Sequence, residues 1–183
     1  MNFIAGLLFF AAFLPYVFAI ISGETTPSPV TWFIWAAVDT LVLVAMLREK
    51  ARSGQLIGAV MGAWLITILA VFYGNPTMDP VEWISIAGAV LGITLWKYTG
   101  RALLAIICSN VVIFIGSFPT FANAYVDPAT EDPVAWSIWF VSCIFALFAV
   151  RKWDVANAMQ PVTFFVIETI MVLLVVVRPL ITS

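Results

Sequence analysis

Histidine is absent from this sequence and charged residues are scarce, which argues against several classes of protein. Only 10% of the 183 residues are Asp, Glu, Lys or Arg, whereas soluble domains carry about 25%. A chain that is 63% hydrophobic cannot cover a water-facing surface, so its solvent is expected to be lipid. With eight basic residues and a net charge of −2, it also lacks the phosphate-tracking surface of a nucleic-acid-binding protein.

Catalytic and cofactor signatures are missing as well. The sequence offers no cluster of metal ligands and no nucleophile paired with a base, so we expect neither an enzyme nor a bound cofactor or metal. Cys108 and Cys143 both lie in apolar segments and are interpreted as small core residues rather than as a disulfide or a metal pair. The first apolar run continues through Ile21 with no basic region before it, which predicts a spanning helix rather than a cleaved signal.

Long apolar runs are what the sequence does contain. A spanning helix needs about 20 apolar residues. Seven segments meet this requirement, at residues 3–22, 30–47, 55–73, 81–99, 102–124, 134–150 and 161–178. Pro29, Pro80, Pro133 and Pro161 are each predicted to begin a helix, where the missing amide hydrogen costs nothing. The sequence therefore predicts an all-α, polytopic membrane protein with seven transmembrane helices.

A frame of residues recurs in the second half of the chain at an offset of 104. The residues of the first copy are Pro15, Pro29, Val30, Trp32, Ile34 and Trp35. Those of the second are Pro119, Pro133, Val134, Trp136, Ile138 and Trp139. The offset maps the first three segments onto the last three and leaves 81–99 without a partner. We therefore predict two parallel three-helix units, 1–78 and 102–183, joined by a linker helix at 79–101.

A second parsing of the repeat is open. Pro80-Val81-Glu82-Trp83 resembles the Pro-Val-x-Trp start of the other two segments, which would give three hairpins and one extra helix. It ranks second because the first and third segments do not share the frame around Pro15.

Charged residues are distributed unequally between the predicted loops. Seven of the eight Lys and Arg fall on one side of the predicted membrane, at Arg48, Lys50, Arg52, Lys97, Arg101, Arg151 and Lys152. The positive-inside rule makes this side cytoplasmic, with the N-terminus inside and the C-terminus outside. The other side carries Glu24, Asp79, Glu82, Asp127, Glu131 and Asp132. These acids are either ordinary solvated loop residues or a rim that raises the local cation concentration.

Two acids lie where an ordinary solvated position is not available. Asp39 is at the middle of 30–47 and Glu168 is near the middle of 161–178. A charge at the centre of a spanning helix costs roughly 2.5–3.5 kcal/mol on insertion scales, so both should face the bundle interior. Each is predicted to exchange a proton or bind a cation. The alternative is a protonated acid that hydrogen-bonds to a neighbouring helix.

Aromatic and amide side chains complete the predicted substrate site. Trp35 shares a helix face with Asp39, and the matching face of the second unit carries Trp139. Trp64 aligns with Glu168 at the offset of 104, so the two are predicted to flank one central cavity as a stacking surface and a carboxylate. The alternative for Trp64 is a ring that fills a gap between helices.

Further polar, proline and glycine positions lie inside the predicted helices. Asn110 and Asn123 are expected to line the cavity or to cross-link helices. Pro15 and Pro119 each remove a backbone hydrogen bond and disturb the turn before them. They are predicted to be hinges for alternating access or static kinks. Gly58-x-x-x-Gly62 is typical of a helix face that a neighbour approaches closely.

The stretch from Asn110 to Phe121 reads Asn-Val-Val-Ile-Phe-Ile-Gly-Ser-Phe-Pro-Thr-Phe. It resembles the first helix of a SWEET-type repeat, and together with the three-one-three plan the chain resembles the SWEET and PQ-loop superfamily. This resemblance implies a facilitative or proton-linked carrier with a site at the bilayer midplane, in which Pro15 and Pro119 match the hinge prolines. Tyr16 and Thr120 stand where the family has glutamine after these prolines.

The predicted function is transport of a small polar or cationic solute by alternating access, with the lipid bilayer as solvent and proton or cation coupling. The alternative is a non-transporting PQ-loop-type receptor or a structural subunit of a membrane complex. The direction of transport and the formation of a homo-oligomer are left open.

Overall fold

The computed structural model describes residues 1–25, 27, 29–74 and 80–182, in which every regular element is helical. The elements are α1 (Asn2–Ala11), α2 (Phe13–Ser22), α3 (Pro29–Arg48), α4 (Gly54–Tyr73), α5 (Pro80–Thr99), α6 (Ala102–Gly116), α7 (Phe118–Val126), η1 (Pro128–Thr130), α8 (Pro133–Ala149), α9 (Val155–Val172), η2 (Leu173–Val177) and α10 (Arg178–Thr182). η1 is a single 3₁₀ turn, and η2 is a π-helical turn that continues α9 into α10.

Four stretches of helix are long and apolar enough to cross a membrane. They are Asn2–Ser22, Gly54–Tyr73, Ala102–Val126 and Val155–Ile181. α8 is apolar but shorter, with 17 residues. Large apolar side chains such as Phe18, Phe72 and Phe148 are more than 70% exposed, which suits contact with acyl chains rather than water. The chain is thus all-helical, and several of its helices fit an integral membrane protein.

Prolines mark three helix starts, as the sequence predicts. α3, α5 and α8 begin at Pro29, Pro80 and Pro133. The Oδ1 atom of Asp132 accepts hydrogen bonds from the amides of Val134 and Ala135 at 2.7 and 2.9 Å, which caps α8.

The prediction that Pro161 begins the last long helix is wrong. α9 begins at Val155, and Pro161 lies buried inside it. Asp154 provides the helix start instead, because its Oδ1 atom accepts a hydrogen bond from the amide of Asn157 at 3.1 Å. The residues from 155 to 160 therefore belong to the helix rather than to the preceding loop.

The helices that contain Pro15 and Pro119 are both interrupted just before the proline. α1 and α2 are separated at Ala12, and α6 and α7 are separated at Ser117. A proline removes the hydrogen bond to the carbonyl one turn earlier and crowds that turn. The predicted disturbance of the backbone is confirmed at both places.

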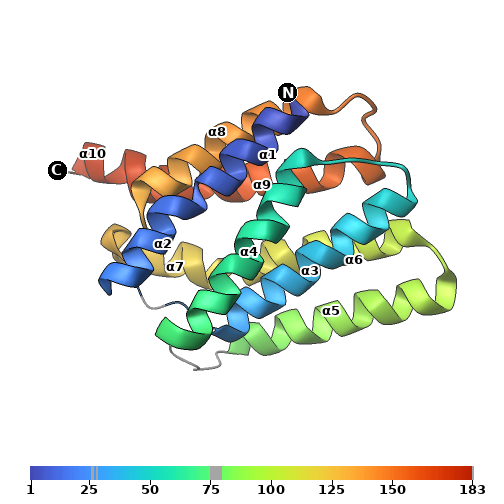
Figure 1. Ribbon diagram of the computed structural model, residues 1–183, viewed down its shortest axis with the longest axis horizontal. Coiled ribbons are helices and arrows are strands. Elements are labelled where there is room, and N and C mark those ends of the chain that lie inside the picture. The colour runs from blue at the N-terminus through green and yellow to red at the C-terminus, as the bar shows by residue number, and fades with distance from the viewer. Residues whose placement is uncertain (26, 28, 75–79, 183) are drawn as a thin grey trace.

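Six helical segments form a closed ring in which each contacts the next. α1 packs against α4, α4 against α3, α3 against α6, α6 against α9, α9 against α8, and α8 against α1 (Figure 1). α5 lies outside this ring, mainly against α6. The connections α3–α4, α5–α6 and α8–α9 lie together at the right of Figure 1. We call this side the basic end, because its residues 48–53, 97–101 and 150–154 hold seven of the eight Lys and Arg.

Glycines allow α4 to approach α1 and α2 closely. A Cβ atom added at Gly58 would collide with the carbonyl oxygen of Gly6, and one added at Gly62 would collide with the ring of Phe13. The close-approach face predicted from Gly58-x-x-x-Gly62 is therefore confirmed.

Candidate functional site

The two repeated tryptophan pairs adopt the same geometry. The rings of Trp32 and Trp35 in α3 lie 5.2 Å apart at 77°. Those of Trp136 and Trp139 in α8 lie 5.2 Å apart at 73°. Tyr16 in α2 lies between the pairs, 5.4 Å from Trp32 and 6.3 Å from Trp139. The structure thus brings both copies of the sequence frame around one aromatic cluster.

Trp139 is fixed within this cluster. Its Nε1 atom donates a hydrogen bond to the carbonyl oxygen of Phe9 at 3.0 Å. The rings of Phe9 and Phe13 lie 6.0 and 5.0 Å from its own ring. Trp139 is buried, whereas Trp35 is half-buried. The donation to Phe9 lies close to the interruption at Ala12, where α1 and α2 meet.

Glu131 borders the aromatic cluster at the end of the molecule opposite the basic end. It follows η1, and its Oε2 atom accepts a hydrogen bond from Trp136 Nε1 at 3.0 Å. Burial raises the pKa of Glu131 to about 7, with a further contribution from the charge of Asp132, while the hydrogen bond from Trp136 opposes both. Glu131 is close enough to Tyr16 and Glu168 to interact with both electrostatically.

Buried polar side chains form a chain of hydrogen bonds that starts at the basic end. Ser53 Oγ donates to Gln160 Oε1 at 2.8 Å. Gln160 Nε2 donates to Gln55 Oε1 at 3.2 Å, and Gln55 Nε2 donates to Cys143 Sγ at 2.9 Å. These four side chains are at most 4% exposed. They connect α4, α8 and α9 at a depth where an unpaired amide would be costly.

Beyond Cys143 the series is extended toward Glu131 by proximity and not by hydrogen bonds between the described residues. Cys143 is near enough to Glu168, and Glu168 to Glu131, for their charges to act on one another. We call the series from Ser53 through Gln160, Gln55, Cys143 and Glu168 to Glu131 the polar line. It leads from the loop that follows Arg52 to the loop that precedes Asp132.

Gln55 and Gln160 are functional candidates that the sequence analysis missed. Gln55 is the second residue of α4, and a polar side chain at this position of a sequence predicts a helix end that is exposed to solvent. Gln160 precedes Pro161, the predicted helix start, and therefore falls in a predicted loop. The N-capping acid Asp154 was the available signal that Gln160 lies within a helix.

Several buried polar atoms have no hydrogen-bond partner among the described residues. They are Asp39 Oδ1, Ser109 Oγ, Asn110 Oδ1 and Glu168 Oε2. Asp39 lies nine residues before Arg48, and Ser109 lies eight after Arg101. Both are therefore roughly 12–14 Å from the basic end of their helices. α3 packs against α6, so by this count Asp39 is about as far from the basic end as Ser109 and Asn110 on the adjacent helix.

Trp64 does not face Glu168, and the prediction that they flank one cavity is wrong. Trp64 is 37% exposed and belongs to an apolar outer stripe of α4. The other members of this stripe are Ile57, Met61, Ile68 and Val71. Trp64 Nε1 donates to Thr40 Oγ1 at 3.1 Å, and its ring lies 5.7 Å from that of Phe33. The indole of Trp64 therefore lies between α3 and α4 on the outer face of the helices.

The physical reason is a change of register between the two halves. α3 has 20 residues and α8 has 17, while the loops that follow them, 49–53 and 150–154, are equally long. α4 and α9 therefore begin at Gly54 and Val155, an offset of 101 rather than 104. At this offset the counterpart of Glu168 is Thr67, which is buried as Glu168 is.

The burial pattern of α9 agrees with the corrected register. Six of its seven buried residues, 156, 160, 164, 167, 168 and 171, correspond to 55, 59, 63, 66, 67 and 70 of α4, which are all buried. The seventh, Pro161, corresponds to Val60, which is half-buried. The remaining predicted positions Pro119 and Asn123 have side chains that lie outside the described part of the structure.

Comparison with protein-family models, with curated proteins and with solved structures found no match.

Proposed function

We propose that this chain is a membrane transporter that moves a small cationic solute by alternating access. The observation that carries the proposal is the polar line, which passes through helices whose outer faces are apolar. Its member Glu168 is 5% exposed, and its Oε2 atom has no partner among the described residues. An unpaired buried carboxylate is costly. A cation or a proton that enters from one side would offset that cost.

The order of helix contacts supports a plan of two related units, 1–78 and 102–183, with 79–101 as linker. In the first unit α4 lies between α1 and α3, and in the second α9 lies between α8 and α6. The contacts between units, α1 with α8 and α3 with α6, are equivalent under the same exchange. Inward- and outward-open states would arise if these two contacts opened and closed in turn.

The chemistry around the polar line favours a cation over an anion. No described residue among those that are buried is Lys or Arg. Glu131 and Glu168 provide carboxyl groups that a bound cation would hold in the ionised form, and the cluster of Tyr16, Trp32 and Trp139 provides aromatic faces. Aromatic faces attract ammonium groups by about 0.5–2 kcal/mol each. A small organic ammonium ion combines the charge and size that such a site would accept.

The interruptions before Pro15 and Pro119 are proposed to be the places where helices bend between the inward- and outward-open states. Because each proline lacks the amide hydrogen of a regular turn, bending near Ala12 or Ser117 would break fewer backbone hydrogen bonds than bending an intact helix. The basic end is proposed to face the cytoplasm, in line with the positive-inside rule.

The test is uptake of labelled tetramethylammonium and choline by proteoliposomes, compared with a neutral sugar and with a carboxylate of similar size. We expect saturable uptake of the organic cations and its loss in Glu168→Gln. The matched control is Glu24→Gln, an exposed acid at the same end of the molecule, which should leave uptake intact.

Proton coupling is tested in the same vesicles with an imposed pH gradient. Loss of the response to the gradient in Asp39→Asn would support a proton-responsive role for this residue. Intact uptake in Glu168→Gln, or an equal preference for the neutral sugar, would overturn the proposal. Specific binding without flux would instead favour a receptor that does not transport.

A further inference from the structure

A cleft of about 670 Å³ opens at the basic end of the molecule. Its lining residues come from the start of α1, the α3–α4 loop, the end of α8, the α8–α9 loop and the first half of α9. Lys50 and Arg52 from one loop and Arg151 from the other line it, and all three are exposed. The cleft is distant from the aromatic cluster and does not rest on the proposed function.

We propose that this cleft binds the phosphate group of an anionic membrane lipid. Three cations from two loops converge on one concave surface, and no carboxylate is among its lining residues. Lys50, Arg52 and Arg151 form no ion pair within the part of the chain that the structure describes. Basic pockets between helices at the membrane surface are suited to anionic lipid head groups.

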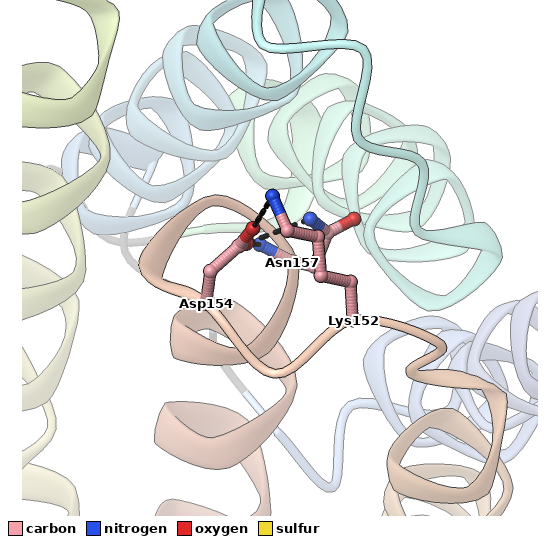
Figure 2. Close-up of polar contacts among 3 residues, drawn as sticks. All are labelled: Lys152, Asp154 and Asn157. Atoms are coloured by element: carbon pink, nitrogen blue, oxygen red, sulfur yellow. Dashed lines mark hydrogen bonds and ion pairs between the residues drawn. The ribbon is translucent and has the colours of Figure 1, made fainter.

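The carboxylate next to the cleft does not cancel this charge. Asp154 lies beside the lining residue Asn157, which donates Nδ2–H to Asp154 Oδ1 at 2.7 Å (Figure 2). Lys152 Nζ lies 2.8 Å from Asp154 Oδ2 and pairs with it. The hydrogen bond from Lys152, followed by that from Asn157, lowers the pKa of Asp154 to about 2. Asp154 therefore stays charged at neutral pH but is already neutralised by Lys152. Glu49, the other acid of these loops, does not line the cleft.

Apolar side chains in the same cleft distinguish a lipid from free phosphate. Phe148 and Met1 line it and are 76% and 62% exposed, and Ala149 and Val150 lie beside Arg151 in the lining. An inorganic phosphate would contact only the cations. A phospholipid would contact the cations with its head group and Phe148 with its glycerol and acyl region, so that both parts of the lining are used.

The polar donors of the cleft are largely occupied, which leaves the binding to the cations. Asn2 Nδ2 donates to the carbonyl oxygen of Arg52 at 3.4 Å, and Ser53 Oγ donates to Gln160. Asn157 donates to Asp154. Removal of the three charges should therefore remove most of the affinity for an anionic lipid.

Native mass spectrometry of the detergent-solubilised protein tests the proposal. Phosphatidylglycerol and phosphatidylcholine with the same acyl chains are titrated separately. We expect the wild-type protein to retain phosphatidylglycerol at least about tenfold better, and the variant Lys50→Gln/Arg52→Gln/Arg151→Gln to lose this preference. The matched control is Lys97→Gln/Arg101→Gln, because these residues lie at the basic end but do not line the cleft.

Competition separates the two sources of phosphate. Millimolar inorganic phosphate should leave the phosphatidylglycerol adduct in place if Phe148 contributes, and Phe148→Ser should weaken the adduct while the three cations remain. Complete displacement by inorganic phosphate would overturn the assignment to a lipid. The proposal is also overturned if the triple variant, shown to be folded by its circular dichroism, keeps the preference, or if the control variant loses it equally.

Discussion

The helices α4 and α9 occupy equivalent places in the ring but bury different chemistry. α4 buries small residues, among them Gly58, Gly62 and Ala63, against α1 and α2. α9 buries Gln160 and Glu168. α4 thus combines a close-packed face with the buried amide of Gln55, whereas of these two helices only α9 buries a carboxyl group. Two helices can therefore make equivalent packing contacts while only one of them buries a carboxyl group, because the packing contacts do not require that group.

The largest expected effect is overpacking of the close-packed face of α4. Gly58→Leu in α4 should lower the free energy of unfolding by about 1–3 kcal/mol or more, because any Cβ at this position collides with the backbone of Gly6. At its counterpart in α9, Met159→Leu should have little effect, since a large side chain is already accommodated there. Thermal unfolding in detergent measures both, and equal losses in the two variants would contradict the comparison.

The next largest effect is a difference in uptake between a substitution in α9 and the corresponding substitution in α4. Glu168→Gln should reduce uptake of organic cations to background, because the negative charge in the interior is removed. Thr67→Val, the change at the corresponding position of α4, should retain most of the uptake. The measurement is initial uptake in proteoliposomes, with protein insertion checked for each variant. Loss of uptake in Thr67→Val alone would reverse the roles assigned to α4 and α9.

A double-mutant cycle tests the hydrogen bonds that join the copies. Gln55→Leu should lower the free energy of unfolding by about 1–3 kcal/mol, because Gln160 Nε2 then has no acceptor and Cys143 loses its donor. Gln160→Leu should cost a similar amount, and the double variant should cost less than the sum. Simple additivity would mean that the two amides do not interact.

Glu131 should make stability depend on pH. Burial raises its pKa from the ordinary value of 4.5 to about 7, so the folded state binds a proton more tightly than the unfolded state. Its contribution is fully present below pH 4.5, is lost as the pH rises from 4.5 toward 7, and does not change above that. Thermal unfolding at pH 5 and 7.5 should show a higher midpoint at pH 5. The difference should shrink in Glu131→Gln and persist in the exposed control Glu24→Gln.

The smallest expected effect concerns Trp64. Trp64→Phe removes the hydrogen bond to Thr40 on the outer face and should cost about 0.5–1.5 kcal/mol of stability. Uptake should be unchanged, because the ring contacts Phe33 rather than the polar line. A selective loss of uptake would restore Trp64 as a candidate for substrate contact.

The parts of the fold that depend only on residues adjacent in the sequence could be predicted from the sequence. Pro29, Pro80 and Pro133 begin helices, and the turns before Pro15 and Pro119 are disturbed, because proline acts on its own turn. Pro161 was misread since the cap formed by Asp154 supports an earlier start.

The candidate site was predicted only in part. Asp39 and Glu168 were found because a carboxylate within an apolar run has no ordinary surface position, and both are buried. Gln55 and Gln160 were missed because an amide near a helix end gives no signal of burial. Their pairing depends on a contact of α4 with α8 across the ring, in addition to the contact of α9 with α8 inside the ring sequence.

The sequence by itself determined the lipid-compatible composition, the helical class and the repeated frame, because run length, proline position and recurrence are properties of the chain alone. Tertiary structure decided which side chains meet. α8 is three residues shorter than α3, so α9 is shifted in register relative to α4, and this turns Trp64 outward while Glu168 stays inside. A shift of three residues rotates the buried face of a helix by about 300°. An alignment of the two halves at a constant offset of 104 does not show this rotation.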